Sequence, residues 1–290
     1  MTVQTDDLAS LEAGLDALET HTTARVSRVT KAWSAIWPPL LFVLLLLGVW
    51  QLVYSAHVAP QYKLPSPSQV LSALNEEASR GELSEAVWNS VRRGGIGFLA
   101  SLAIATPLGL LVGRVRPVRR AVGPILSGLQ SLPSVAWVPA AVLWFGFSDA
   151  TIYFVVLFGA VPSIANGVVS GLDQVPPLFL RVGRVLGAKG LDSARYVLLP
   201  AALPGYVGGM RQGWAFSWRS LMAAELIARS PDLGLGVGQL LDSARQNVDI
   251  AGVIAGVFTI LVIGIAVELC VFAPLERRVL RRRGLLAATF

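Results

Sequence analysis

The chain has 290 residues, of which 54% are hydrophobic and only 14% are charged, and its net charge is +6. Soluble domains carry about 25% charged residues, so this composition indicates an integral membrane protein. One cysteine and two histidines offer neither a disulfide framework nor a Cys/His metal cluster, and we expect no metal site.

Residues 1–34 form a polar tail in which four leucines between residues 8 and 18 make one apolar stripe on a short acidic helix. A solvated tail helix explains this stripe, and a docking or regulatory role is the alternative. The apolar run 35–56 begins too late and is too long for a cleaved signal peptide. We therefore predict that residues 35–56 are the first transmembrane helix, followed by an external segment over residues 57–93.

Five more apolar runs of spanning length follow within residues 94–274, the predicted transmembrane core. They cover residues 94–113, 121–148, 150–172, 201–226 and 250–274. The first three runs carry no charge, whereas the last two contain Arg211, Arg219, Glu225 and Glu268. The sequence therefore predicts an all-α integral membrane protein with six transmembrane helices.

Lysines and arginines are distributed unequally between the two sides of this arrangement. Sixteen lie in the N-terminal tail, the loops after the second and fourth spans and the C-terminal tail 275–290, against six in the segments on the opposite side; the remaining two, Arg211 and Arg219, lie within a span. Because cytoplasmic loops are enriched in Lys and Arg, we expect both termini to face the cytoplasm. The positive charge is thus a signal of topology, and we expect no nucleic-acid partner.

The most informative segment is the loop 173–200, which this topology places on the cytoplasmic side. Pro176-Pro177 opens the loop, Leu199-Pro200 closes it, and Gly187 permits a backbone turn between two short helices. The first helix has an apolar face with arginines on its flanks, formed by Leu178, Arg181, Val182, Arg184, Val185 and Leu186. An apolar stripe exposed to the cytoplasm predicts docking into a groove of another protein.

The end of this loop resembles a family signature. Gly187, followed after nine residues by Val197-Leu198-Leu199-Pro200, is similar to the second half of the signature loop of ABC importer permeases. That family often has Glu-Ala-Ala six residues before the glycine, where this chain has Arg181-Val182-Gly183. Further matching motifs occur in order at 64–67, 137–139, 143–146, 199–204 and 223–226. Together they resemble the nitrate, sulfonate and taurine branch, and an aliphatic sulfonate permease most.

The resemblance implies the type I importer permease (MetI-like) fold and a place in the bacterial inner membrane. It implies four kinds of partner: a second copy of the chain, two ATP-binding cassette subunits, an extracytoplasmic substrate-binding protein and membrane lipid. The chain has no G-x-x-x-x-G-K-[ST] motif, so we expect no enzyme activity and no cofactor here, with ATP and Mg²⁺ bound in the partner ATPase. A glycine-rich stretch at 234–238 is only a weak match to a phosphate-binding loop.

The expected substrate is a small organic oxyanion such as an aliphatic sulfonate. Taurine, nitrate, bicarbonate and pyrimidine-type nutrients are alternatives within the same importer class. An ion-coupled secondary transporter is the alternative from another class, although no pair of matching broken helices supports it.

Polar and aromatic residues inside two spans are candidates for the translocation pathway, because charges within a membrane are costly. In the run 201–226 they share one helical face and its edge: Arg211, Trp214, Trp218, Arg219 and Glu225. In the run 121–148, Gln130, Ser134 and Trp137 recur at helical spacing near Pro133 and Pro139. The guanidinium fork of arginine matches a planar oxyanion, and pairing with Glu225 or Glu268 is the structural alternative.

Overall fold

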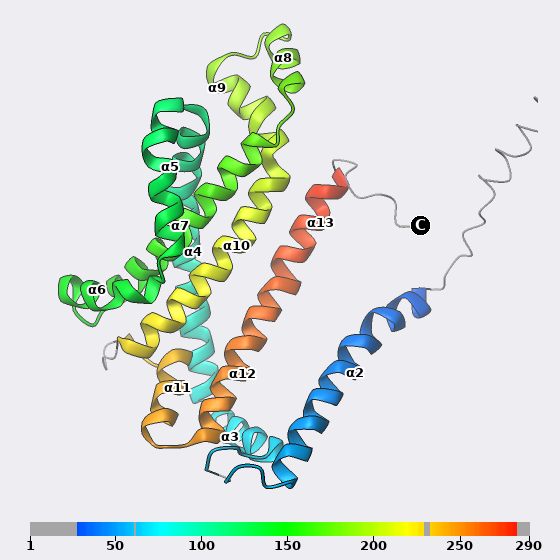
Figure 1. Cartoon of the computed structure of the whole chain (residues 1–290), viewed down its shortest axis with the longest axis vertical. Coiled ribbons are helices and arrows are strands. Elements are labelled where there is room, and N and C mark those ends of the chain that lie inside the picture. Colours follow the sequence, from blue (N-terminus) through cyan, green and yellow to red (C-terminus); the bar gives the residue numbers. More distant parts are fainter. Residues whose placement is uncertain (1–27, 61, 229–232, 283–290) are drawn as a thin grey trace, which may run out of the picture. The chain divides into compact units, whose positions relative to one another are not determined.

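The computed structural model describes residues 28–60, 62–228 and 233–282, and within them every regular element is helical (Figure 1). The chain divides into two compact units, residues 1–56 with 288–290, and residues 57–287. We describe each unit by itself. The predicted apolar stripe between residues 8 and 18 lies outside the described residues.

The first unit contains α2 (Arg28–Ser55), which covers the predicted first transmembrane run except for its last residue, Ala56. Its segment Trp37–Ser55 is long and apolar enough to cross a membrane. Side chains along it, such as Leu41, Leu45 and Leu52, are more than half exposed within the protein. Exposed leucines on a helix of this length are suited to contact with lipid.

The second unit begins with α3 (Pro67–Ser79), in which Ser66 caps the helix and Pro67 occupies the first turn. The elements that follow are α4 (Glu82–Arg114), α5 (Arg116–Ser131), a 3-10 turn (Ser134–Trp137), α6 (Val138–Phe145) and α7 (Asp149–Asp173). The loop then forms α8 (Pro177–Val185), α9 (Gly190–Asp192) and a π-helical turn (Ser193–Leu198). The chain ends with α10 (Leu199–Ile227), α11 (Val237–Gln246), α12 (Ile250–Val267), a second π-helical turn (Glu268–Phe272) and α13 (Ala273–Arg282).

Four helical stretches in the described residues are long and apolar enough to span a membrane, or five if α5 and α6 form one broken span. Six spans were predicted, and the difference lies in α10. This helix has 29 residues, a sufficient length, but its charges and polar residues lower its hydropathy. The run 121–148 is helical on both sides of Pro133, where α5 and the following helices bend by 96°.

The centre of the second unit is α7, which packs between α4 and α10. Its contact with α10 depends on glycines that lack a Cβ. A Cβ on Gly167 would lie 2.3 Å from the Cα of Gly209, and one on Gly205 would lie 2.5 Å from the Cα of Gly171. On each helix the two glycines are four residues apart, Gly167 and Gly171 on α7 and Gly205 and Gly209 on α10. This spacing is the small-residue pattern that lets membrane helices approach closely.

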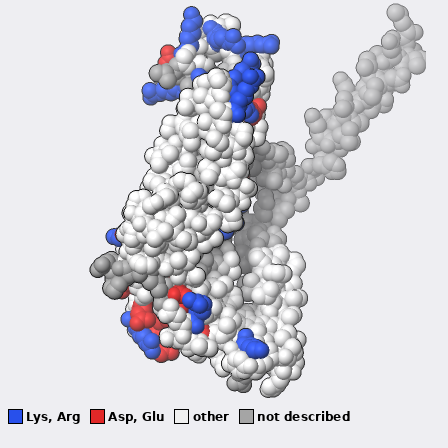
Figure 2. Space-filling view, turned by 60° about the vertical axis from the view of Figure 1, so that its left-hand side comes forward, with Lys and Arg blue, Asp and Glu red and all other residues white. Residues whose placement is uncertain are grey.

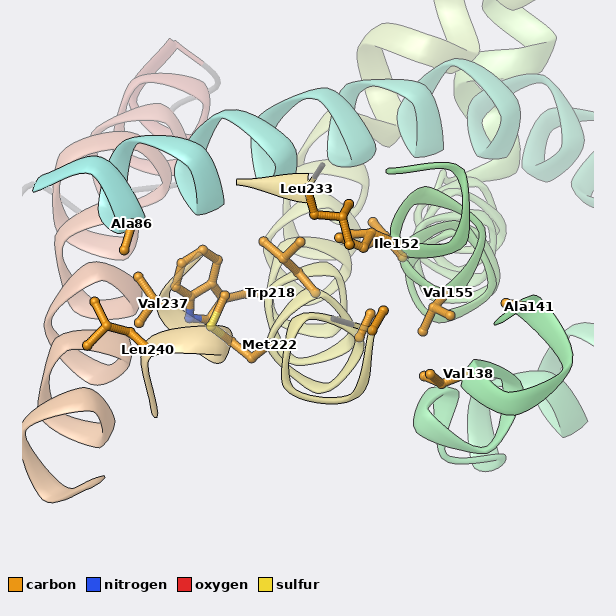
Figure 3. Packing of buried hydrophobic residues seen from close by; sticks show 14 of the residues in the cluster. Ala86, Val138, Ala141, Ile152, Val155, Trp218, Met222, Leu233, Val237 and Leu240 are labelled. Carbon is orange, nitrogen blue, oxygen red and sulfur yellow. The ribbon is translucent and has the colours of Figure 1, made fainter. Parts of the chain in front are cut away.

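The largest buried cluster joins α10 to its neighbours (Figure 3). Trp218 and Met222 of α10 lie among side chains from α4, α7 and α11, including Ala86, Val155 and Leu240. Charged residues collect at the two ends of the unit. In Figure 2, Lys and Arg gather at the end that holds α8 and α9, an uncharged band follows, and acidic and basic residues mix at the opposite end.

Candidate functional site: docking helix and buried polar network

The predicted docking helix is present as α8. Pro177 lies in its first turn, where a missing N–H costs nothing, and the helix ends at Val185. Leu178, Val182, Val185 and Leu186 are 62%, 47%, 87% and 81% exposed. Gly187 has φ +87°, so the predicted turn after the helix uses the left-handed conformation that glycine adopts most easily.

The opposite side of α8 is fixed by the signature motif. A Cβ on Gly183 would lie 2.7 Å from Cγ2 of Val197, so the two segments of the loop touch where Gly183 has no side chain. Leu198, Val175 and Ala202 form a small buried cluster beneath them, against which Leu180 of α8 packs. Leu199 and Pro200 begin α10, and Ala202 of this cluster belongs to that helix. The loop therefore connects α8 firmly to α10, and the departure from Glu-Ala-Ala leaves Arg181 exposed at the surface.

The predicted pathway face of α10 is mostly packed inside the same subunit. Trp214 and Trp218 are 8% and 6% exposed and stack with ring centroids 6.0 Å apart. The indole N–H of Trp218 donates to the carbonyl of Ile260 on α12 at 3.3 Å. Trp218 thus links α10 to α12, and Trp214 packs against Phe98 of α4 and Phe272 of the second π-helical turn.

The two arginines of α10 have different surroundings. Arg211 forms ion pairs with Glu268 at 2.6 Å and Glu276 at 3.3 Å, so for this residue the structural pairing with Glu268 is confirmed. The guanidinium of Arg219 lies 4.6 Å from the ring centroid of Phe216, and its Nε donates to the carbonyl of Ala215. Among the described residues no carboxylate forms an ion pair with Arg219, and its side chain is exposed.

The three polar candidates of the broken span lie at or beside its bend and touch neighbouring helices. Gln130 accepts a hydrogen bond from the amide of Asn166 at 2.8 Å. The hydroxyl oxygens of Ser134 and Ser220 are 2.7 Å apart, which links the bend to α10. The Trp137 ring lies 4.7 Å from that of Phe158 on α7. The bend is therefore held by specific contacts to α7 and α10.

Sequence reasoning missed a buried ionic network between α4, α7, α10 and the start of α11. Arg93 is 2% exposed; its Nε donates to Asp149 at 2.8 Å and its Nη1 to Glu225 at 3.3 Å. Arg93 also donates to the carbonyl of Leu233. Glu225 is fully buried and accepts further bonds from the hydroxyl of Ser90, at 2.7 and 2.9 Å to its two oxygens.

The glycine-rich stretch 234–238 takes part in this network. The backbone N–H of Gly238 donates to Oε2 of Glu225 at 3.1 Å, and that of Val237 donates to Ser90 at 2.9 Å. A Cβ on Gly236 would lie 2.6 Å from the Glu225 carboxylate. The glycines thus approach a carboxylate of the protein itself, and the network ties this segment to three helices. A glutamate buried in a predicted span needs a cation as its partner. In the sequence, the position of Arg93 directly before the charge-free run 94–113 was the signal that could have identified this partner.

Three comparisons with known proteins agree with this arrangement. Residues 105–281 match the family model described as the binding-protein-dependent transport system inner membrane component. The chain is 30% identical over 245 residues to the putative aliphatic sulfonates transport permease protein SsuC of Bacillus subtilis, covering 84% of this chain and 87% of that protein. It is also 30% identical over 238 residues to the taurine transport system permease protein TauC of Escherichia coli, covering 80% and 85%.

The fold is similar to that of one chain in an inward-facing structure of the MetNI methionine ABC transporter. The TM-score is 0.56 at 22% sequence identity, and the match covers 70% of this chain and 98% of the other. This likeness supports the predicted MetI-like fold. The chain therefore belongs to the family of inner-membrane components of binding-protein-dependent transport systems.

Proposed function

We propose that this chain is the translocation subunit of an ATP-driven importer for a small organic oxyanion such as an aliphatic sulfonate. Family membership favours an importer permease over an ion-coupled secondary transporter. In this proposal the chain itself is not an enzyme. ATP and Mg²⁺ bind in two partner ATPase subunits, and an extracytoplasmic binding protein delivers the substrate.

The exposed apolar face of α8 carries the proposal. Burying a valine or leucine side chain contributes roughly 1.5–3 kcal/mol, so covering Val185 and Leu186 with a groove on an ATPase would stabilise the complex substantially. The contact of Gly183 with Val197 and the cluster around Leu198 join α8 to α10. A movement of the ATPase that displaces α8 is thereby passed to α10 and, through its glycine contacts, to α7.

Copurification of the ATPase with the full chain tests this docking surface. Val185→Asp places a carboxylate on the proposed contact, where burial without a partner costs several kcal/mol, and it should abolish copurification. Val185→Leu keeps the apolar surface and should retain the ATPase. Val248→Asp is the positional control, because Val248 is 82% exposed on the segment between α11 and α12. If Val185→Asp retains the ATPase as well as Val248→Asp does, the docking surface is elsewhere.

We further propose that two copies of the chain enclose the pathway between them. The tryptophan face of α10 is filled by its own subunit, so a pathway has to use side chains that one subunit leaves exposed, such as Arg219. A symmetric pair places both copies of Arg219 around one axis. Mass measurement of the complex in detergent should give two copies of this chain for two ATPase subunits, and a stable complex with a single copy would contradict the pairing.

The substrate class rests on Arg219 and on the relatives. A guanidinium that forms no ion pair with a carboxylate among the described residues suits an oxyanion such as a sulfonate or nitrate, because it offers several donors in a fixed geometry to the anion's oxygens. The similar proteins of Bacillus subtilis and Escherichia coli have names that refer to aliphatic sulfonates and taurine. Direct binding measurements on the partner binding protein, with sulfonate, taurine, nitrate, bicarbonate and pyrimidine compounds, decide among the alternatives.

Both termini are proposed to face the cytoplasm.

A further inference from the structure

A groove of about 790 Å³ opens between α8, α10 and α13. One part of its lining is apolar and includes Phe179, Leu203, Leu275 and Val279. The other part is cationic and consists of Arg278 and Arg282, which are four residues apart on α13 and therefore share a helix face. The groove thus combines an apolar wall with a positively charged rim.

The position of this rim along the helix matches the headgroup region of a bilayer. The helical stretch Ile250–Arg282 has 33 residues. At 1.5 Å per residue it is about 50 Å long, close to the roughly 40–45 Å of a bilayer with its headgroups. Arginines in its last two turns therefore lie near lipid phosphates, and Leu275 lies one turn closer to the acyl chains.

The two arginines of the rim are available for an anion. The acidic residues nearest to them in the sequence, Glu268 and Glu276, both form ion pairs with Arg211 of α10. Within the described part of the chain, neither Arg278 nor Arg282 forms an ion pair with a carboxylate. Basic pockets between membrane helices are a known recognition mode for anionic lipid headgroups.

We propose that this groove binds an anionic phospholipid. The phosphate lies between Arg278 and Arg282, and an acyl chain follows Leu203, Leu275 and Val279. Because the groove includes Phe179 of α8, a bound lipid joins the docking helix to α13 and supports its position. None of the four exposed α8 side chains that are proposed to contact the ATPase lines this groove, although Phe179 lies next to them on the helix.

Native mass spectrometry of the whole complex tests the proposal. After delipidation, the complex is mixed with phosphatidylglycerol, with phosphatidylcholine of the same acyl chains, or with inorganic phosphate. Phosphatidylglycerol should be retained in preference to phosphatidylcholine. Each arginine should contribute about fivefold in affinity, so Arg278→Gln with Arg282→Gln should weaken phosphatidylglycerol binding roughly 25-fold.

Arg277→Gln with Arg281→Gln is the matched control, because it removes the same charge from the same helix outside the groove. It should leave binding close to wild type. Val279→Trp keeps the charge but fills the groove, and it should also displace the lipid. Equal losses in both double variants would show a diffuse surface attraction and overturn the proposal. Equal retention of phosphatidylglycerol and phosphatidylcholine would also overturn the proposal. Tight binding of inorganic phosphate alone, or a groove that another subunit covers in the complex, would overturn it as well.

Discussion

Removal of the cation from the buried network is expected to be the most destabilising single change among the polar residues of the second unit. Arg93→Met keeps most of the side-chain length but leaves Glu225, which is fully buried, without a positive partner. Breaking a buried ion pair from one side costs about 3–5 kcal/mol, because an uncompensated charge stays behind. The hydroxyl of Ser90 and the N–H of Gly238 still donate to Glu225, so we expect the lower half of that range.

Two further variants separate the buried pair from the exposed one. Asp149 also pairs with Arg93 but is 45% exposed, and an exposed partner is worth about 0–1 kcal/mol, so Asp149→Asn should have a small effect. Combining Arg93→Met with Glu225→Met removes both buried charges, and the loss should be clearly smaller than the sum of the two single losses.

The assay is the free energy of unfolding of the purified protein in mild detergent, followed by tryptophan fluorescence. Limited proteolysis between α10 and α11 provides a local readout, because Arg93 and Glu225 hold this segment through Leu233 and Gly238. The account predicts that Arg93→Met increases cleavage there and Asp149→Asn does not. An Arg93→Met protein as stable as wild type, or one less damaged than Asp149→Asn, would refute the assigned role of the network.

Three other predictions concern packing, pH and the pathway. Gly209→Ala should lower the free energy of unfolding by about 1–3 kcal/mol because its Cβ would meet Gly167 at 2.6 Å, whereas Gly208→Ala has nothing within 4 Å and should be neutral or stabilising. The pKa of Glu77, on α3 outside the spans, is raised from 4.5 to about 7, chiefly by burial and then by Glu82 and Asp249. Between these two pH values the folded state keeps the Glu77 proton while the unfolded state loses it, so thermal stability should fall as pH rises from about 4.5 to about 7. Glu77→Gln should remove this pH dependence. An unchanged pH profile in the variant would contradict the prediction. Arg219→Gln should reduce sulfonate uptake with normal assembly, and Arg219→Lys should be intermediate; loss of assembly would make Arg219 a structural residue.

The helix α8 could be predicted from the sequence because its signals are local. Proline at its start, helical spacing of apolar residues and Gly187 at the turn each depend on neighbours within a few positions. The role of Gly183 was missed, since its contact with Val197 appears only when the loop folds back. The run 121–148 was predicted as one span, and its sharp bend follows from Pro133, whose ring cannot continue a regular helix.

The buried network could not be predicted, because its members come from distant parts of the chain. Ser90 and Arg93 lie more than 130 positions from Glu225, and only tertiary packing brings them together. The pathway face of α10 shows the same limit. Helical spacing correctly placed Trp214 and Trp218 on one side, but it could not say whether that side faces a pore or the neighbouring helices, where they lie within this subunit.

ATP-driven uptake in proteoliposomes tests the central claim most directly. The vesicles contain the full chain with its ATPase subunits, the binding protein is added on the side opposite the ATPase, and labelled ethanesulfonate is the substrate. The account predicts uptake that requires ATP, Mg²⁺ and the binding protein, is lost in Val185→Asp and is retained in Val248→Asp. Uptake that continues without ATP, or that Val185→Asp leaves at the wild-type rate, would contradict an importer coupled to its ATPase through α8.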